Sequence, residues 1–193
     1  MGAQSLRHGI QVVFLACMWM VSGGCSSTSS SHASAGAPGA NEWYISGVPF
    51  YPQLAYQCGP ASLAAVLNYW GDQVTPDEIA RAIYSPRLKG TLSLDMWQYA
   101  RAQQFQADMR RGSLEDLKVH VHANIPVIAF LNLGYEWLPG GHFVVVVGLD
   151  PDKGFVITYS GKEQDSRISY DRFLKAWQKT NFWTLVVRPK TDT

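Results

Sequence analysis

The segment before residue 70 combines a cysteine with a strongly helix-forming run. Cys58 is followed by Gly-Pro-Ala-Ser-Leu-Ala-Ala-Val-Leu, so the cysteine lies at the expected start of an apolar helix over 59–69. A sulfur in that position lies near the positive end of the helix dipole, which favours the nucleophilic thiolate. Cys58 is therefore a candidate nucleophile, and its alternative role is that of a small buried apolar residue.

A histidine further along the chain could supply the base that a thiol nucleophile needs. His142 follows Gly140 and Gly141 and opens the apolar run 143–148, so its ring is expected at the rim of a buried strand. The two glycines would leave room for a peptide substrate. A histidine at a strand end is often only structural, but together with Cys58 a general base is the better interpretation.

An amide donor precedes the cysteine. Gln53 lies five residues before Cys58, and its side chain could stabilise an oxyanion together with the Cys58 backbone N–H at the helix start. Gln57 competes for this role, although adjacent side chains usually point apart. These groups could form a thioester by thiol attack on a carbonyl carbon, with His142 protonating the leaving amine and water completing hydrolysis.

The segments around these residues predict helices first and antiparallel strands second, which is an α+β fold with the cysteine-bearing helix packed on a C-terminal sheet. Thr75, Ser93 and Ser113 are expected helix caps. Helices are expected over 59–69, 75–84, 93–104, 113–123 and 169–178. Strands are expected over 126–132, 143–148, 155–159 and 182–187, with the middle two joined as a hairpin.

Residues 1–24 predict a lipoprotein-type signal peptide. Basic residues precede an apolar stretch over 10–21, which is short for a membrane span, and small residues then lead to Cys25. Cys25 is the predicted lipidation site, which would anchor the mature chain to a bacterial cell-envelope membrane. An ordinary signal peptide or an uncleaved anchor are the alternatives. Ser26, which is not aspartate, favours the periplasmic face of the outer membrane.

The remaining composition predicts a flexible tether over 25–42 and one folded domain over 43–190. A net charge of +1 and 47% hydrophobic residues are typical of a globular domain, and no basic patch indicates nucleic-acid binding. With Cys17 removed and Cys25 lipidated, Cys58 would have no disulfide partner. His120 and His122 have no cysteine or acidic cluster beside them, so neither a metal nor another cofactor is expected.

The run Pro52-Gln53-x4-Cys58-Gly59-Pro60-Ala61, followed later by Gly140-Gly141-His142-Phe143-Val-Val-Val-Val-Gly148, resembles the bacteriocin-processing peptidases. This cysteine peptidase family of the papain-like clan cuts after a double glycine in leader peptides. The similarity covers about 48–187 and is closest to the family's stand-alone periplasmic lipoprotein relatives. It implies the papain-like fold, no cofactor, and catalytic roles for Gln53, Cys58 and His142.

One position departs from the family pattern. The family typically has an aspartate, followed by proline, on the strand after the histidine strand, whereas this chain reads Ile-Thr-Tyr-Ser-Gly over 157–161. Tyr159 and Ser160 are the local candidates for orienting His142, and Asp165 is a distant one. A hydroxyl orients an imidazole less strongly than a carboxylate does.

Three functions are compatible with these residues. The first is a lipid-anchored cysteine endopeptidase, a thiol protease acting on peptide or protein substrates in the periplasm, which the intact Gln53, Cys58 and His142 favour. The second is an acyltransferase or amidase that uses the same thioester, for instance on cell-wall peptides. The third is a non-catalytic peptide-binding module, which the missing acid favours.

Overall fold

The computed structural model describes residues 41–52, 57–134 and 140–190 of the chain. The predicted signal peptide and nearly all of the predicted tether lie outside these residues, as do two predicted functional residues, Cys25 and Gln53. Within the described residues, no helix is both long and apolar enough to cross a membrane.

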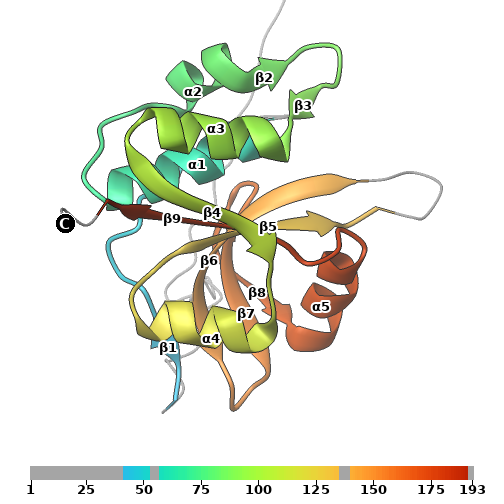
Figure 1. The fold of residues 1–193 in the computed structure, drawn as a ribbon. Helices are drawn as coiled ribbons and strands as arrows, with labels where there is room; N and C mark the ends of the chain where they lie inside the picture. Colours follow the sequence, from blue (N-terminus) through green and yellow to red (C-terminus); the bar gives the residue numbers. More distant parts are fainter. Residues whose placement is uncertain (1–40, 53–56, 135–139, 191–193) are drawn as a thin grey trace, which may run out of the picture. The chain divides into compact units, whose positions relative to one another are not determined.

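Five helices and nine strands are described, and Figure 1 shows their arrangement. The helices are α1 (Cys58–Tyr69), α2 (Pro76–Ile83), α3 (Ser93–Ala102), α4 (Leu114–His122) and α5 (Tyr170–Gln178). The strands are β1 (Trp43–Tyr44), β2 (Tyr84–Ser85), β3 (Gly90–Thr91), β4 (Phe105–Arg111), β5 (Val127–Asn132), β6 (Gly141–Asp150), β7 (Phe155–Ser160), β8 (Glu163–Ser169) and β9 (Trp183–Pro189).

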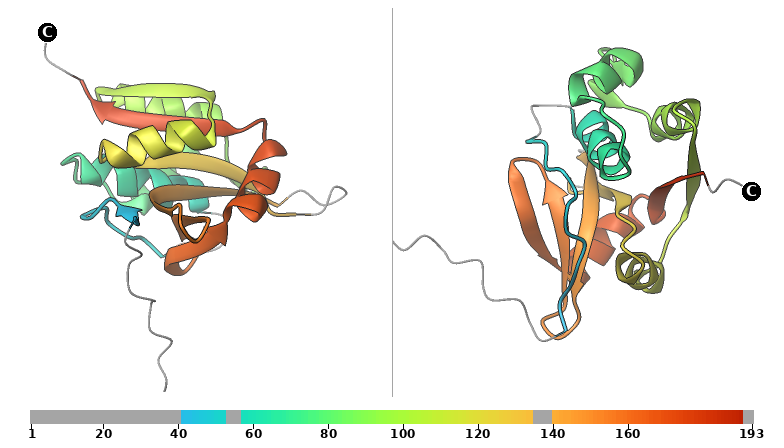
Figure 2. Two further views of the ribbon diagram at one scale, coloured as in Figure 1. Left: turned by 90° about the horizontal axis from the view of Figure 1, so that it is seen from below. Right: turned by 90° about the vertical axis from the view of Figure 1, so that its left-hand side faces the viewer.

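One antiparallel sheet organises the domain, in the order β4-β9-β5-β6-β7-β8, with β1 added against β6. Strand β6 is buried from Phe143 onward, as expected for a β-branched run in the centre of a sheet. Helices α1, α2 and α3 pack together on one side of the sheet, whereas α4 and α5 lie on the other (Figures 1 and 2). This arrangement confirms the predicted α+β class.

Helix α1 is central because its sequence is apolar on nearly every side. All residues from Gly59 to Leu67 are buried, and the helix packs on β6. The chain leaves the helix through Gly71, whose φ of +96° belongs to the left-handed region that glycine adopts without strain. A buried helix of this kind fixes its first residue, Cys58, rigidly against the sheet.

The predicted helix starts are largely confirmed. Thr75 and Glu78 form a reciprocal capping box at α2, and the Ser113 side chain accepts a hydrogen bond from the backbone of Asp116 at α4. The prediction for α3 is wrong by one residue, because Leu92 occupies the cap position and Ser93 is the first helical residue.

Five of the nine described strands are not predicted from the sequence: the two-residue strands β1, β2 and β3, and the longer strands β4 and β8. Strand β6 is longer than predicted. Strands β4 and β8 form the two edges of the sheet and carry alternating polar side chains with few β-branched residues. Neither has the apolar run by which a strand is usually recognised. Strand β6 begins at Gly141, so His142 is paired with Leu131 inside the ladder.

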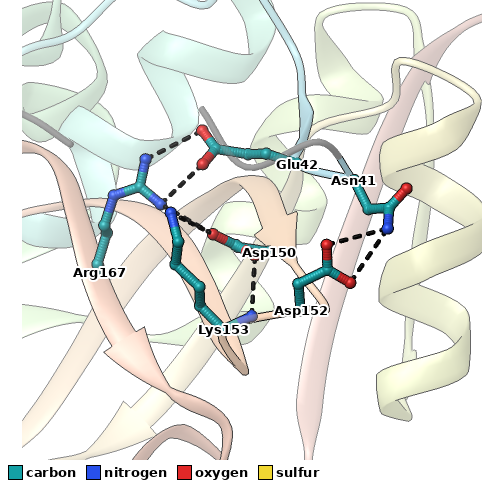
Figure 3. A network of polar contacts seen from close by, with 6 residues as sticks. All are labelled: Asn41, Glu42, Asp150, Asp152, Lys153 and Arg167. Carbon is teal, nitrogen blue, oxygen red and sulfur yellow. Dashed lines mark hydrogen bonds and ion pairs between the residues drawn. The ribbon is translucent and has the colours of Figure 1, made fainter. Parts of the chain in front are cut away.

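A polar network fastens the chain where it enters the domain (Figure 3). Glu42 makes a bidentate ion pair with Arg167 at 2.9 and 3.0 Å. Arg167 also lies 3.7 Å from the fully buried carboxylate of Asp150, to which Lys153 contributes a second cation at 3.6 Å. Since Asp150 ends β6 and His142 is near its start, this network lies at the opposite end of the strand from the histidine.

Candidate active site

Cys58 is the first residue of α1, and its sulfur is surrounded by backbone donors. It is half-buried, and the nearby backbone N–H groups of Phe143, Gly59 and Cys58 itself favour its thiolate. Burial raises the pKa of the Cys58 thiol above its usual value, and the N–H groups lower it by less. The expected effect of the helix start is therefore present, but burial outweighs it.

The contact with Phe143 brings the two candidate catalytic residues together. Phe143 follows His142 in β6, so the nucleophile lies beside the backbone of the candidate base. Sequence reasoning missed the Phe143 N–H as a donor to the sulfur, since a backbone group carries no residue-type signal.

His142 is half-buried at the start of β6, and its ring is held by a hydroxyl. Its Nε2 lies 3.0 Å from Ser160 Oγ at the end of β7. Burial lowers the pKa of His142 below its usual value. If Nδ1 is to accept a proton from the thiol, Nε2 must carry the hydrogen and donate it to Ser160.

Strand register explains why Ser160 reaches the histidine. The ladder pairs Val145 with Tyr159, which places Ser160 diagonally across from His142 on the same face of the sheet. Tyr159 points to the opposite face, where its hydroxyl donates to the carbonyl of Val48 at 3.2 Å.

The third orienting candidate is also engaged elsewhere. Asp165 accepts a 2.6 Å hydrogen bond from the hydroxyl of Tyr44, which in turn lies 3.1 Å from the Tyr159 hydroxyl. Burial raises the pKa of Tyr44, and its hydrogen bond to Asp165 raises it further. Of Tyr159, Ser160 and Asp165, the structure brings only Ser160 into contact with His142.

The two glycines before His142 are required by the protein itself. A Cβ on Gly141 would lie 2.6 Å from the Phe130 ring, and one on Gly140 would lie 3.0 Å from the backbone nitrogen of Gly134. Phe130 cannot easily move, because its ring stacks on Phe143 with centroids 4.4 Å apart. Packing against Phe130 and Gly134 is therefore a reason for glycine at these positions, in addition to the expected room for a substrate.

No metal site is evident among the described residues, in which no group of three or more His, Cys, Asp or Glu side chains could hold an ion. His120 lies with Nε2 3.1 Å from Arg110 and Nδ1 2.6 Å from the carbonyl of Asp116. The ring of His122 packs on Trp43 with centroids 3.6 Å apart. Both histidines serve the local structure.

Comparison with known families identifies the family of this chain. The model of the peptidase C39-like family matches residues 45–184, a range that includes Cys58, His142 and Ser160. The chain belongs to the peptidase C39-like family. Among proteins with curated functions, none matches this sequence. Family and fold together support a cysteine peptidase function.

Solved structures share the fold of this C39-like domain. A protein from Bacillus anthracis assigned as a C39-like peptidase is 19% identical, with a TM-score of 0.64 over 79% of this chain and 100% of its own. The peptidase domain of Streptococcus ComA, a bifunctional ABC transporter of a quorum-sensing pathway, is 20% identical, with a TM-score of 0.62 over 75% and 100%.

A third similar structure is a double glycine motif protease from an AMS/PCAT transporter, in complex with the leader peptide. It is 24% identical, with a TM-score of 0.61 over 76% of this chain and 94% of its own. These likenesses confirm the predicted papain-like α+β fold.

An open pocket lies at the start of strand β6 in this C39-like domain. It has a volume of about 320 Å³ and lies beside Gly141, between Ser93 at the start of α3 and Lys179 after α5. Phe130 and Trp183 contribute aromatic surface to it. Gly141 lines the pocket and His142 does not, because neighbouring residues in a strand face opposite sides of the sheet.

Proposed function

We propose that this protein is an endopeptidase that hydrolyses peptide bonds through a thioester on Cys58, with His142 as general base and then general acid. The observation that carries the proposal is the convergence of two contacts. The Cys58 sulfur lies near the backbone N–H of Phe143, the residue after His142, and the Nε2 atom of His142 lies 3.0 Å from Ser160 Oγ. These contacts support assigning the roles of nucleophile, base and orienting group to Cys58, His142 and Ser160.

The pKa shifts indicate how the reaction would begin. Burial favours the neutral thiol of Cys58 and the neutral imidazole of His142. The thiol would therefore transfer its proton to His142 Nδ1 as the sulfur attacks the substrate carbonyl. The imidazolium then protonates the leaving amine, and water attacks the thioester to release the acid.

Two groups are proposed to stabilise the oxyanion. The Cys58 backbone N–H belongs to the first residue of α1, where it has no partner within the helix. Gln53, which lies outside the described residues, is proposed as the second donor because of its spacing from the cysteine.

The substrate is proposed to be a peptide or protein with a small residue next to the scissile bond. A leader peptide is bound in one structure that shares this fold, the double glycine motif protease. We propose that this chain likewise acts on extended peptides, with a preference for a double glycine before the cleaved bond.

The test is cleavage of a diverse peptide library by the purified full-length chain, read by mass spectrometry, with Cys58→Ala and His142→Ala as comparison. Cleavage by the wild type alone supports the proposal. Equal cleavage by Cys58→Ala contradicts it. Peptide binding without cleavage in the wild type indicates the non-catalytic module, and transfer of the acyl group to an added amine indicates the acyltransferase.

We further propose that the chain is attached to the periplasmic face of the bacterial outer membrane through a lipid on Cys25. The support is the signal-like sequence before Cys25 and the small polar residues after it. Cys25→Ser should release the protein into the soluble fraction. Retention of this variant in the membrane fraction would exclude lipidation as the means of attachment.

A further inference from the structure

Residues 132–134, at and just after the end of β5, lie against residues 140–141, at the start of β6. We call these two segments the arms of a neck, in which one side chain accepts hydrogen bonds from both arms. Asn132 is the last residue of β5 and pairs with Gly141. Its Oδ1 accepts from the backbone N–H of Gly134 at 3.0 Å and of Gly140 at 3.1 Å. The Leu133 N–H donates to the Gly140 carbonyl at 3.0 Å, which closes the neck a second time.

The neck is closely packed on its other sides. The two arms approach so nearly that a Cβ on Gly140 would lie 3.0 Å from the nitrogen of Gly134. From the end of α5, Lys179 Nζ donates to the Gly134 carbonyl at 3.1 Å. The Thr180 hydroxyl donates to the carbonyl of Phe130 at 2.5 Å, which fixes β5 beneath the neck.

This geometry matters because two glycines directly precede the candidate base. Glycine has the widest intrinsic backbone freedom of the amino acids, and rotation at Gly140 or Gly141 would displace the His142 ring. Pairing with Asn132 in the ladder restrains Gly141, but Gly140 lies outside the strand. The described contacts that hold Gly140 are those to the Asn132 side chain and to Leu133.

We infer that Asn132 is a positioning residue for the reaction: by accepting from both arms of the neck, it fixes the backbone from which His142 reaches Cys58. The inference rests on the proposed function and adds a residue to it. Asn132 also lines the pocket beside Gly141, but it touches neither the thiol nor the imidazole in the described contacts. Its assigned effect is on the position of His142, and a role in substrate binding would change KM instead.

The chemistry of the contact makes the inference testable. Both partners of the Asn132 side chain are N–H donors, so the oxygen is the atom required and the amide nitrogen is dispensable at the neck. Asn132→Asp keeps an acceptor at the same place. Asn132→Leu has nearly the same shape and no acceptor. Asn132→Ser is too short to reach both N–H groups and serves if the leucine variant does not fold.

The experiment measures kcat and KM for release of p-nitrophenolate from the p-nitrophenyl ester of an N-acylated glycine, with the full-length chain. We expect Asn132→Leu to lower kcat by about 10- to 100-fold, as misplacement of a catalytic group by about an ångström does, with KM changed less than about threefold. Asn132→Asp should restore kcat to within about threefold of wild type. Asn41→Leu removes another asparagine hydrogen bond, at the far end of β6, and should leave kcat unchanged.

Two results would overturn the inference. One is wild-type kcat in folded Asn132→Leu and Asn132→Ser. The other is equal loss of kcat in the leucine and aspartate variants, which would show that the acceptor oxygen is not what matters. Failure of the wild type to release p-nitrophenolate faster than Cys58→Ala is a different outcome, because it contradicts the proposed function itself.

Discussion

Replacing Ser160 with aspartate should move the acid limb of the pH–activity profile of this peptidase to higher pH. The Ser160 hydroxyl is the described partner of His142 Nε2, at 3.0 Å. A carboxylate in its place would stabilise the imidazolium, which a neutral hydroxyl does only weakly. The pKa of His142, which burial lowers in the native protein, should therefore rise.

The magnitude follows from the change in hydrogen-bond type. A neutral hydrogen bond contributes about 0.5–1.5 kcal/mol, and one to a charged group about 1.5–3 kcal/mol. The difference of about 1–2 kcal/mol corresponds to a rise of about one pH unit in the His142 pKa, at 1.36 kcal/mol for each unit. Ser160→Ala, which removes the partner, should lower kcat about fivefold if about 1 kcal/mol of orientation is lost.

The assay is kcat/KM against pH for wild type, Ser160→Asp and Ser160→Ala. In the free enzyme, His142 must be neutral to accept the thiol proton, so activity is lost as pH falls through its pKa. Since burial raises the pKa of Cys58 and lowers that of His142, the acid limb belongs to the histidine.

The limb of the pH profile that moves distinguishes two protonation states of Cys58 and His142, the neutral pair and the ion pair. Movement of the alkaline limb with a fixed acid limb would show that Cys58 and His142 are already an ion pair at rest, and the reasoning from burial would be refuted. No movement of either limb would show that Ser160 does not bind His142 in solution.

Two further substitutions test the packing and the polar network. Gly141→Ala places a methyl group 2.6 Å from the Phe130 ring and should lower the free energy of unfolding by about 1–3 kcal/mol. Adding Phe130→Leu should restore part of the lost stability. A denaturant midpoint equal to wild type for Gly141→Ala would contradict the proposed clash. Arg167→Ala removes one of two cations near the buried Asp150 carboxylate and should cost about 2 kcal/mol in urea unfolding. Lys175→Ala, which breaks an exposed pair, should cost less than about 0.5 kcal/mol, and an equal effect of the two variants would contradict burial as the reason.

The positions of Cys58 at a helix start and of His142 near a strand start could be predicted because their signals are local. A cysteine before an apolar helical run, and a histidine between glycines and a β-branched run, define their own secondary structure within a few residues. The class of the fold follows from the same runs, since helices and buried strands are recognised by periodicity and β-branched content.

The remaining features depend on residues that are distant in sequence. The choice between Tyr159 and Ser160 requires the register of β7 on β6, because adjacent residues in a strand face opposite sides. The tight fit at Gly141 depends on Phe130 in the neighbouring strand. The thiol pKa depends on how deeply α1 is buried, which the helix sequence alone does not determine.

The edge strands β4 and β8 could not be recognised from their sequences for a different reason. Strands β4 and β8 each pair on one side only, and polar side chains keep such edges soluble. Their residues therefore lack the apolar pattern that reveals the central strands. Asp165 illustrates the consequence: it is an acid close in sequence to Ser160, but β8 directs it to Tyr44.

The central claim, that Cys58 forms an acyl intermediate with the help of His142, is tested most directly by trapping that intermediate. The purified full-length chain is mixed with the p-nitrophenyl ester of an N-acylated glycine, quenched in acid within milliseconds to seconds, and mapped by peptide mass spectrometry. We expect a burst of p-nitrophenolate and an acyl group on Cys58. The burst should be at least about tenfold slower in His142→Ala, since general base catalysis is worth about 10²–10⁴-fold. Absence of acylated Cys58 during turnover, or an unchanged burst in His142→Ala, would contradict it.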